Sequence, residues 1–328
     1  MTRRFPLAVL SLVLLASACT GEEEPGGPDS SPAAAPMGDA STFSAQVASS
    51  DLAAGSPESV QVGIFSSTAE AGVQVLSYGE VDVSFSFLGA DGSQPAAPGG
   101  PSTTARFVAA PGNDPAGDDG PTLTNPSEVA GVYVTPEVTL PEPGIWNATL
   151  TATVDGGAPV TLEAAFNVYA EHRLPAPGDE ALATKNLTMD SGAAPAAAID
   201  SRAFDGAQVP DPELHDTTIA DALRQHRPAL VQFATPVHCT SNFCGPTVEA
   251  QEELERQYGN VAEFIHIEIW RKFDRGMLNQ AAADWLLRDG DLTEPWLYLI
   301  DANGMIVERW GPLFDLDDVR ASLDALGT

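Results

Sequence analysis

Cys239 and Cys244, in the last third of the chain, are the residues whose type and spacing best suit chemistry. They stand five positions apart, and Gly245 and Pro246 follow the second of them. Because proline favours the first turn of a helix, we expect a helix to begin close to Cys244. A thiolate there would be stabilised by the helix dipole and by free backbone N–H groups. The pair therefore suits a reversible disulfide, although the spacing does not decide which thiol attacks.

The local structure decides whether the two sulfurs can meet. In one regular helix, a spacing of five residues would place the two side chains about 140° apart, which excludes a bridge. We therefore expect residues 236–243 to form a non-helical loop. A permanent structural bridge is the alternative, since such bridges are common in exported proteins. Bridges across short loops stabilise less than bridges across long ones, and this favours a redox role for the pair.

A metal-binding function competes with the redox function. His238 precedes Cys239, and together with Cys244 these side chains could form a soft Cu(I) site. The chain would then be a non-enzymatic Cu(I) metallochaperone or binding module with copper as its cofactor, whereas thiol–disulfide exchange needs no cofactor. His266 lies in the middle of an expected strand, where we expect a packed or surface histidine.

Strands and helices alternate around these residues and must position them. Apolar runs of strand length cover residues 229–234, 264–269, 296–300 and 306–310. Helical patterns cover residues 217–224, 246–258, 277–287 and 315–326. A hairpin turn, Asp301-Ala302-Asn303-Gly304, joins the last two strands.

This order of elements resembles the thioredoxin fold over residues 200–328. Cys244-Gly245-Pro246 opens a helix after a buried strand, and Glu294-Pro295-Trp296 stands just before another strand, where that fold places a cis-proline. The resemblance implies a thiol–disulfide oxidoreductase whose site contains Cys239, Cys244 and Pro295. Its partners would be the thiols or disulfides of exported proteins.

The chain also departs from the thioredoxin pattern. Thr247 stands where the C-G-P-C motif has its resolving cysteine, so Cys239 has to supply the second thiol. Gln232 stands near the place of the family's buried acid, and Glu294 makes the residue before the proline more polar than usual. Peroxiredoxins of the bacterioferritin-comigratory type share the C-x4-C spacing, which implies a peroxidase as a further alternative, but Pro236 occupies the position of their required threonine.

The region before this one has the pattern of an all-β domain. Short alternating strands recur over residues 42–172, and the run from 131 to 146 resembles the immunoglobulin-like domains of bacterial exported proteins. We expect a β-sandwich with a binding or spacer role, with the Gly- and Pro-rich stretch 89–126 as a surface excursion. Residues 173–199 are rich in Ala, Pro and Gly and predict a linker. The predicted fold class is therefore two-domain, an immunoglobulin-like sandwich followed by an α/β thioredoxin-like domain over 200–328.

The N-terminus predicts export and lipid anchoring. Residues 1–18 have a basic start and a short apolar run, typical of a signal peptide. The sequence Leu-Leu-Ala-Ser-Ala-Cys at 14–19 resembles the bacterial lipoprotein cleavage box, which implies that Cys19 carries the lipid. Residues 19–41 lack hydrophobic periodicity and predict a disordered tether. The expected location is extracytoplasmic, on the bacterial cell membrane.

The charge balance excludes one class of partner. The chain of 328 residues has 46 acidic and 15 basic side chains and a formal net charge of −31. Such a surface repels nucleic acid and anionic headgroups. We therefore expect no nucleic-acid partner, and we expect the membrane link to depend on the lipid at Cys19.

Overall fold

The first half of the protein consists of β-strands, in which apolar side chains alternate with polar ones. The computed structural model describes residues 42–327 except 98, 114–119, 193, 240 and 242, so the expected signal peptide, Cys19 and the tether lie outside the described residues. In the strand β6 (Glu80–Phe87), Val81, Val83 and Phe85 are buried while the residues between them are exposed. This period of two places one face of the sheet in a hydrophobic core.

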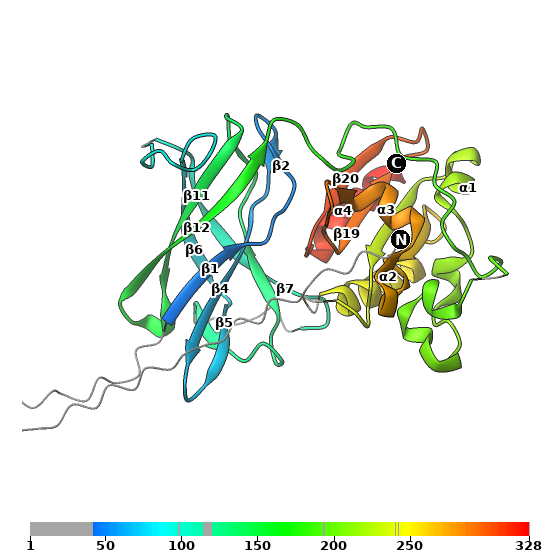
Figure 1. Ribbon diagram of the computed structural model, residues 1–328, viewed down its shortest axis with the longest axis horizontal. Helices are drawn as coiled ribbons and strands as arrows, with labels where there is room; N and C mark the ends of the chain where they lie inside the picture. The colour runs from blue at the N-terminus through cyan, green and yellow to red at the C-terminus, as the bar shows by residue number, and fades with distance from the viewer. Residues whose placement is uncertain are drawn as a thin grey trace, which may run out of the picture. The chain divides into compact units, whose positions relative to one another are not determined.

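Ten strands form one continuous mixed sheet (Figure 1). Its hydrogen-bonded order is β2-β12-β11-β6-β7-β9-β4-β5-β8, with β1 paired to β4. Only β2 and β12 pair in parallel among the strands of this sheet that the structure describes. The strands are β1 (Thr42–Val47), β2 (Leu52–Ala53), β4 (Gln61–Thr68), β5 (Gly72–Ser77), β6, β7 (Ser102–Ala109), β8 (Thr122–Thr124), β9 (Gly131–Val134), β11 (Gly144–Thr153) and β12 (Pro159–Tyr169). A separate short pair joins β3 (Pro57–Glu58) to β10 (Val138–Thr139).

The expected fold class, an immunoglobulin-like sandwich followed by an α/β thioredoxin-like domain, is wrong. A sandwich has two separate sheets, whereas here the hydrogen bonding continues through one large sheet, and residues 39–328 form a single compact unit. The strand β7 explains the difference. It lies within residues 89–126, for which the sequence predicts a surface excursion, yet it pairs with β6 on one side and β9 on the other.

The second half contains a four-stranded sheet in the order β14-β13-β19-β20. β13 pairs in parallel with β14 and antiparallel with β19. The strands are β13 (Ala229–Ala234), β14 (Glu263–Glu268), β19 (Trp296–Ile300) and β20 (Ile306–Trp310). Two further short pairs are β15 (Trp270–Lys272) with β16 (Met277–Leu278), and β17 (Leu287–Arg288) with β18 (Asp291–Leu292).

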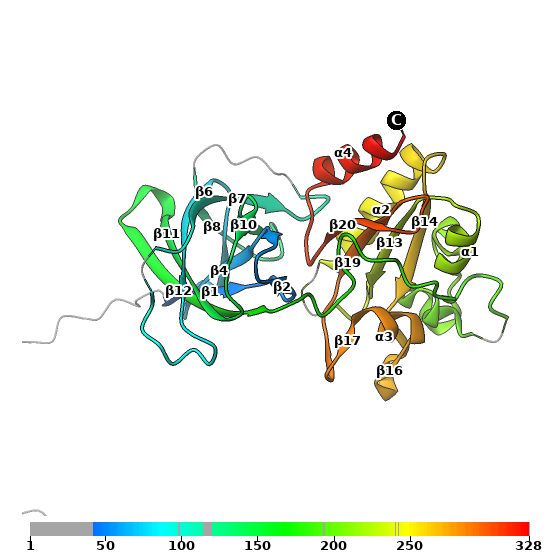
Figure 2. The same ribbon diagram turned by 90° about the horizontal axis from the view of Figure 1, so that it is seen from above.

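Helices cover both faces of this sheet. The helices here are α1 (Ile219–Arg224), α2 (Cys244–Tyr258), α3 (Gln280–Leu286) and α4 (Leu316–Leu326), with short 3-10 helices η2 (Ala196–Ala198), η3 (Ser201–Gly206), η4 (Pro212–His215) and η5 (Phe273–Arg275). The 3-10 helix η1 (Val154–Gly156) instead joins β11 to β12 in the large sheet. Successive residues of β13 alternate between two clusters: Val231 and Phe233 pack with α1 and α3, and Leu230 and Ala234 with α2 and α4. Figure 2 shows α2 and α4 on one side of the sheet and α3 on the other. None of the helices in the described part of the chain is long and apolar enough to span a bilayer.

Individual elements around the cysteines follow the sequence pattern closely. The predicted strands 229–234, 296–300 and 306–310 have the predicted bounds. The helix predicted to start at Pro246 starts at Cys244, because a proline is tolerated anywhere in the first turn, where its missing N–H has no helical partner. The helix predicted over 277–287 is shorter, since Met277 and Leu278 pair with β15 instead.

The two sheets also contact each other through buried polar groups. The side chain of Gln61 donates to the carbonyl of Leu313 at 2.6 Å and accepts its N–H at 3.2 Å. The guanidinium of Arg309 on β20 lies 2.7 Å from the carboxylate of Asp51, next to β2. Asp51 and Arg309 are 2% and 6% exposed, so this ion pair is buried between segments more than 250 residues apart.

Candidate functional site

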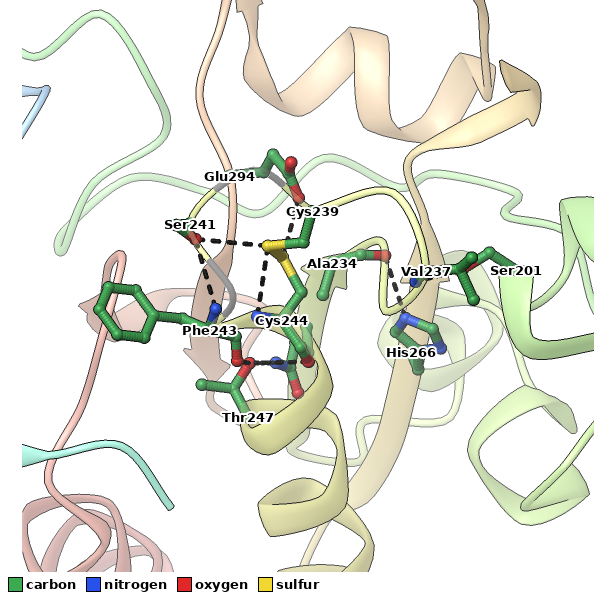
Figure 3. Close-up of a disulfide and its surroundings, with 11 residues drawn as sticks. Ser201, Ala234, Val237, Cys239, Ser241, Phe243, Cys244, Thr247, His266 and Glu294 are labelled. Atoms are coloured by element: carbon green, nitrogen blue, oxygen red, sulfur yellow. Dashed lines mark hydrogen bonds between the residues drawn. A yellow bond between two sulfur atoms is a disulfide. The ribbon is translucent and has the colours of Figure 1, made fainter. Parts of the chain in front are cut away.

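The two cysteines form a disulfide at the start of a helix. Cys244 is the first residue of α2, and Cys239 lies in the loop that follows β13, with the two Cα atoms 6.0 Å apart (Figure 3). The predicted non-helical loop is what allows this approach.

The two sulfurs differ in their access to solvent. Cys244, at the start of α2, is fully buried and packs in the cluster formed by α2, α4 and one face of the sheet. Cys239 is half-buried at the edge of the same cluster. A thiol from another molecule can therefore reach Cys239 far more easily than Cys244. Of the two sulfurs, Cys239 is therefore the one that burial leaves open to a reacting partner.

Two donors approach the sulfur of Cys239. The backbone N–H of Cys244, at the start of α2, donates to Cys239 Sγ at 3.3 Å. Ser241 Oγ lies 3.3 Å from the same sulfur, and since a disulfide sulfur can only accept, the hydroxyl donates (Figure 3). The hydroxyl in turn accepts the N–H of Phe243 at 3.4 Å. These donors favour a negative charge on Cys239 when the disulfide is open.

A carboxylate approaches the other sulfur. Glu294 Oε2 lies 3.1 Å from Cys244 Sγ, and Figure 3 shows Glu294 above the bridge, opposite α2. Burial, followed by the nearby charge of Glu268, raises the pKa of Glu294 to about 7, although the backbone N–H of Thr235 lowers it. Glu294 thus changes its protonation state near neutral pH while it touches a cysteine sulfur.

The Thr247 side chain connects the start of α2 to the sheet. Its hydroxyl donates toward the carbonyls of Phe243 and Cys244 at 3.0 and 3.1 Å, and accepts from the side chain of Gln232 at 2.7 Å. Both Thr247 and Gln232 are fully buried. Thr247 therefore ties the first turn of α2 to β13.

The remaining predicted site residues, Pro295 and His238, lie in different segments of the chain and have different surroundings. Pro295 is buried before β19, and the Glu294–Pro295 peptide is cis, as the resemblance implied. His238 stacks on Phe273 with ring centroids 3.8 Å apart. The side chain that lies with the two sulfurs in one cluster is instead the carboxylate of Glu294. Glu294 is the functional candidate among the described residues that its sequence position marks only as an unusually polar neighbour of the proline.

The spacing of residues in the sequence reveals neither the role of Glu294 beside the cysteines nor the second buried acid near it, Glu268. Glu268, on β14, is 1% exposed and accepts the backbone N–H groups of Ser201 and Trp270 at 2.9 and 3.1 Å. Besides burial, its charge raises the pKa of Glu294, although β13 separates β14 from β19 in the sheet. The site is therefore a disulfide with an accessible sulfur, a buried sulfur and a carboxyl group that titrates near pH 7. No protein-family model matches the chain and no curated protein matches its sequence.

Proposed function

We propose that the protein carries out thiol–disulfide exchange through Cys239 and Cys244, with Glu294 transferring a proton to and from Cys244. The observation that supports this most is the difference between the two sulfurs. The half-buried one is surrounded by hydrogen-bond donors, and the buried one touches a carboxyl group. A purely structural bridge needs neither arrangement.

In the first step, a thiolate of the substrate attacks Cys239 Sγ, the accessible sulfur. A bond forms between the substrate sulfur and Cys239, the Cys239–Cys244 bond breaks, and its electron pair goes to Cys244 Sγ. Protonated Glu294, 3.1 Å away, gives its proton to this leaving sulfur. Because a thiolate buried in apolar surroundings is costly, protonation at this point makes Cys244 a better leaving group.

In the second step, another thiolate of the substrate attacks the substrate sulfur of the mixed disulfide. The electron pair of the breaking bond goes to Cys239, whose charge the Cys244 N–H and the Ser241 hydroxyl stabilise. The substrate leaves oxidised and the protein is reduced by two electrons. In the reverse direction, the Cys239 thiolate attacks a substrate disulfide, ionised Glu294 takes the proton of Cys244, and Cys244 attacks Cys239 Sγ to release the reduced substrate.

The surface beside Cys239 favours a polypeptide as the substrate. Val237 is 45% exposed and Phe273 is 49% exposed, and Phe273 stacks on His238, the residue before Cys239. Trp270 packs edge-on against Phe273 with centroids 5.3 Å apart. Apolar side chains of a substrate could bury this surface. Together with the export signal and the lipid anchor at Cys19 that the sequence predicts, this makes the thiols or disulfides of exported proteins the proposed partners.

Exchange with a dithiol peptide tests the proposal. We expect the protein with Cys19→Ser, which leaves only the pair, to equilibrate with such a peptide and to show a reduction potential above about −300 mV. Cys244→Ser should trap a mixed disulfide between Cys239 and the oxidised, disulfide form of the peptide, whose bond the Cys239 thiolate attacks, and Cys239→Ser should abolish exchange. A potential well below about −300 mV without exchange would identify a structural bridge.

A Cu(I) titration checks the copper alternative. The reduced unaltered protein is compared with Cys239→Ser and His238→Gln, and the copper alternative requires that both variants bind Cu(I) more weakly.

A further inference from the structure

A second group of chemically competent side chains lies apart from the disulfide. It contains Asp200, His215 and His266, all at most 1% exposed. Asp200 is the N-cap of η3, His215 is the last residue of η4, and His266 lies in the middle of β14. The sequence predicts a packed or surface position for His266, and the three residues cannot be connected from their spacing because 66 positions separate the first from the last.

The three side chains present one ligand atom each to a common point. Asp200 Oδ2 lies 3.5 Å from His215 Nε2 and 3.5 Å from His266 Nδ1, and all three atoms lie within 4.8 Å of one another. Around a tetrahedral Zn²⁺ ion with bonds of about 2.0–2.1 Å, neighbouring ligand atoms are about 3.4 Å apart. Both distances from the carboxylate oxygen therefore match a metal ion that binds two imidazoles and one carboxylate.

The hydrogen bonds of His266 fix which of its nitrogens is free. Its Nε2 lies 3.1 Å from the carbonyl of Ala234, and because a carbonyl only accepts, Nε2 carries the hydrogen (Figure 3). In the neutral ring, Nδ1 then presents a lone pair toward Asp200. A ligand histidine that donates its other N–H to a backbone carbonyl is the usual arrangement around protein-bound metals.

His215 supplies a second set of unused atoms. Its Nδ1 has no partner in the described part of the chain, and its Nε2, like His266 Nδ1, faces the Asp200 carboxylate at 3.5 Å without a hydrogen bond of good geometry. Buried polar atoms without partners are rare in folded proteins and need an explanation. A cation between the two rings and the carboxylate would satisfy His215 Nε2 and His266 Nδ1 together.

The charges around the cluster also favour a cation. Arg202 binds Asp200 with Nη2 2.7 Å from Oδ2, and it also contacts Asp211 at 3.2 Å and Glu252 at 2.9 Å. One guanidinium thus faces three carboxylates, which leaves two negative charges in excess when all three are ionised. A divalent cation would neutralise this excess, and the guanidinium would remain as a partner that orients the ligating carboxylate.

We propose that Asp200, His215 and His266 bind one divalent transition-metal ion of the zinc class, with a water molecule as the fourth ligand. The ion would join the short helices η3 and η4 to β14. It would also hold the loop of Cys239, since Ser201, next to Asp200, accepts the N–H of Val237 on its hydroxyl at 3.1 Å. This site does not depend on the proposed exchange reaction, because none of its ligand atoms belongs to the cysteine pair.

Metal content and Co²⁺ binding test the site. We expect the purified protein, with its disulfide intact, to contain about one zinc ion per chain, or to bind about one Co²⁺ after chelation. The Co²⁺ spectrum should lack sulfur-to-metal bands, because both sulfurs are in the disulfide. His215→Ala and His266→Ala should weaken Co²⁺ binding by more than the roughly 10- to 100-fold that loss of an outer partner causes.

Two controls separate this site from other binding. His226→Asn, on an exposed histidine, and the double variant Cys239→Ser/Cys244→Ser should both keep the bound metal. If the ligand variants do not fold, Zn²⁺ removal and return on the unaltered protein still give an answer, because a bound ion must raise the melting temperature in a concentration-dependent way. An unaltered protein that contains no metal, takes up no Co²⁺ and melts at the same temperature with and without Zn²⁺ would overturn the proposal. The proposal also fails if the double cysteine variant loses the metal.

Discussion

The carboxyl group of Glu294 lies 3.1 Å from the sulfur of Cys244, although fifty positions separate the two residues. The turn before β19 places Glu294 over the first residue of α2, where the sulfur is shielded from solvent. A buried sulfur cannot exchange its proton directly with water, so a group beside it has to do this. Glu294 is suited to the task because its pKa is raised to about 7, chiefly by burial.

Replacing Glu294 with glutamine should slow exchange and change its pH dependence. Reduction of a substrate disulfide needs ionised Glu294 as the base for Cys244, so the rate should rise with pH through about 7. In Glu294→Gln this rise should disappear, and the rate above pH 7 should fall by about 100-fold, at the low end for a lost general base. Stopped-flow measurement of peptide disulfide reduction between pH 5 and 9, covering about two units on either side of that pKa, gives both quantities.

A matched control distinguishes proton transfer from a general charge effect. Glu249→Gln removes the same charge from the exposed face of α2. We expect this variant to keep the unaltered rate and the rise near pH 7. If Glu249→Gln and Glu294→Gln behave alike, Glu294 does not act on Cys244.

The same glutamate should make the oxidised protein less stable as the pH rises. The pKa of Glu294 is higher in the folded protein, at about 7, than its ordinary value of 4.5, because burial penalises the ionised form. A group whose folded pKa is raised in this way binds its proton more tightly in the folded state. The free energy of unfolding therefore decreases as the pH rises from 4.5 to about 7. Glu294→Gln lacks this penalty. Urea unfolding at the two ends of the range should show the variant gaining stability relative to the unaltered protein as pH rises, and a constant difference would contradict the assignment.

Local patterns predicted much of the second half of the chain. The strand at 296–300 is a continuous apolar run, and the strand at 229–234 is interrupted only by Gln232. Both are bounded by polar or turn residues, so their ends are encoded locally. The cysteine pair could also be predicted, because both thiols lie in one short segment whose loop and helix start are marked by Pro246. Local information of this kind identifies elements and nearby pairs.

The rest depends on contacts between distant segments. The strand β7 contains Ser102, Thr103, Thr104 and Arg106, so its weak apolar pattern does not reveal that it pairs with β6 and β9 and joins the strands into one sheet. The contact of Glu294 with Cys244, and the group of Asp200 with two histidines, follow no spacing rule. They exist only because the four-stranded sheet and the short helices bring these residues together.

The hydroxyl of Ser241 should influence how readily Cys239 ionises. It lies 3.3 Å from Cys239 Sγ and is one of two donors to that sulfur among the described residues. A hydrogen bond to a charged group contributes about 1.5–3 kcal/mol, so Ser241→Ala should reduce the thiolate fraction of Cys239 roughly 10-fold at a given pH below its titration. Alkylation of the reduced Cys19→Ser/Cys244→Ser background, followed over pH, measures this. The control variant Ser322→Ala on α4 should leave the alkylation profile unchanged. If Ser241→Ala also leaves it unchanged, the hydroxyl does not act on the sulfur.

The buried pair of Asp51 and Arg309 should stabilise the contact between the two sheets. Arg309→Met leaves the carboxylate of Asp51 buried without its cation, which should cost about 3–5 kcal/mol at neutral pH. The double variant Asp51→Asn/Arg309→Met removes the stranded charge, so it should lose less than the sum of the single variants. Guanidinium unfolding of the four proteins gives this double-mutant cycle, and strictly additive losses would show that the two residues do not act together.

The acid dependence of this pair gives an independent check. Burial opposes ionisation of Asp51, but the hydrogen bond with His172 and the charge of Arg309 outweigh it and lower its pKa from 3.8 to about 2. A carboxyl group with a lowered folded pKa contributes stability above its unfolded pKa and loses it as the pH falls through the folded one. The unaltered protein should therefore lose stability between pH 3.8 and about 2 more steeply than Arg309→Met, in which the main cation is gone. Parallel curves for the two proteins over this range would mean that Arg309 does not hold the proton off Asp51.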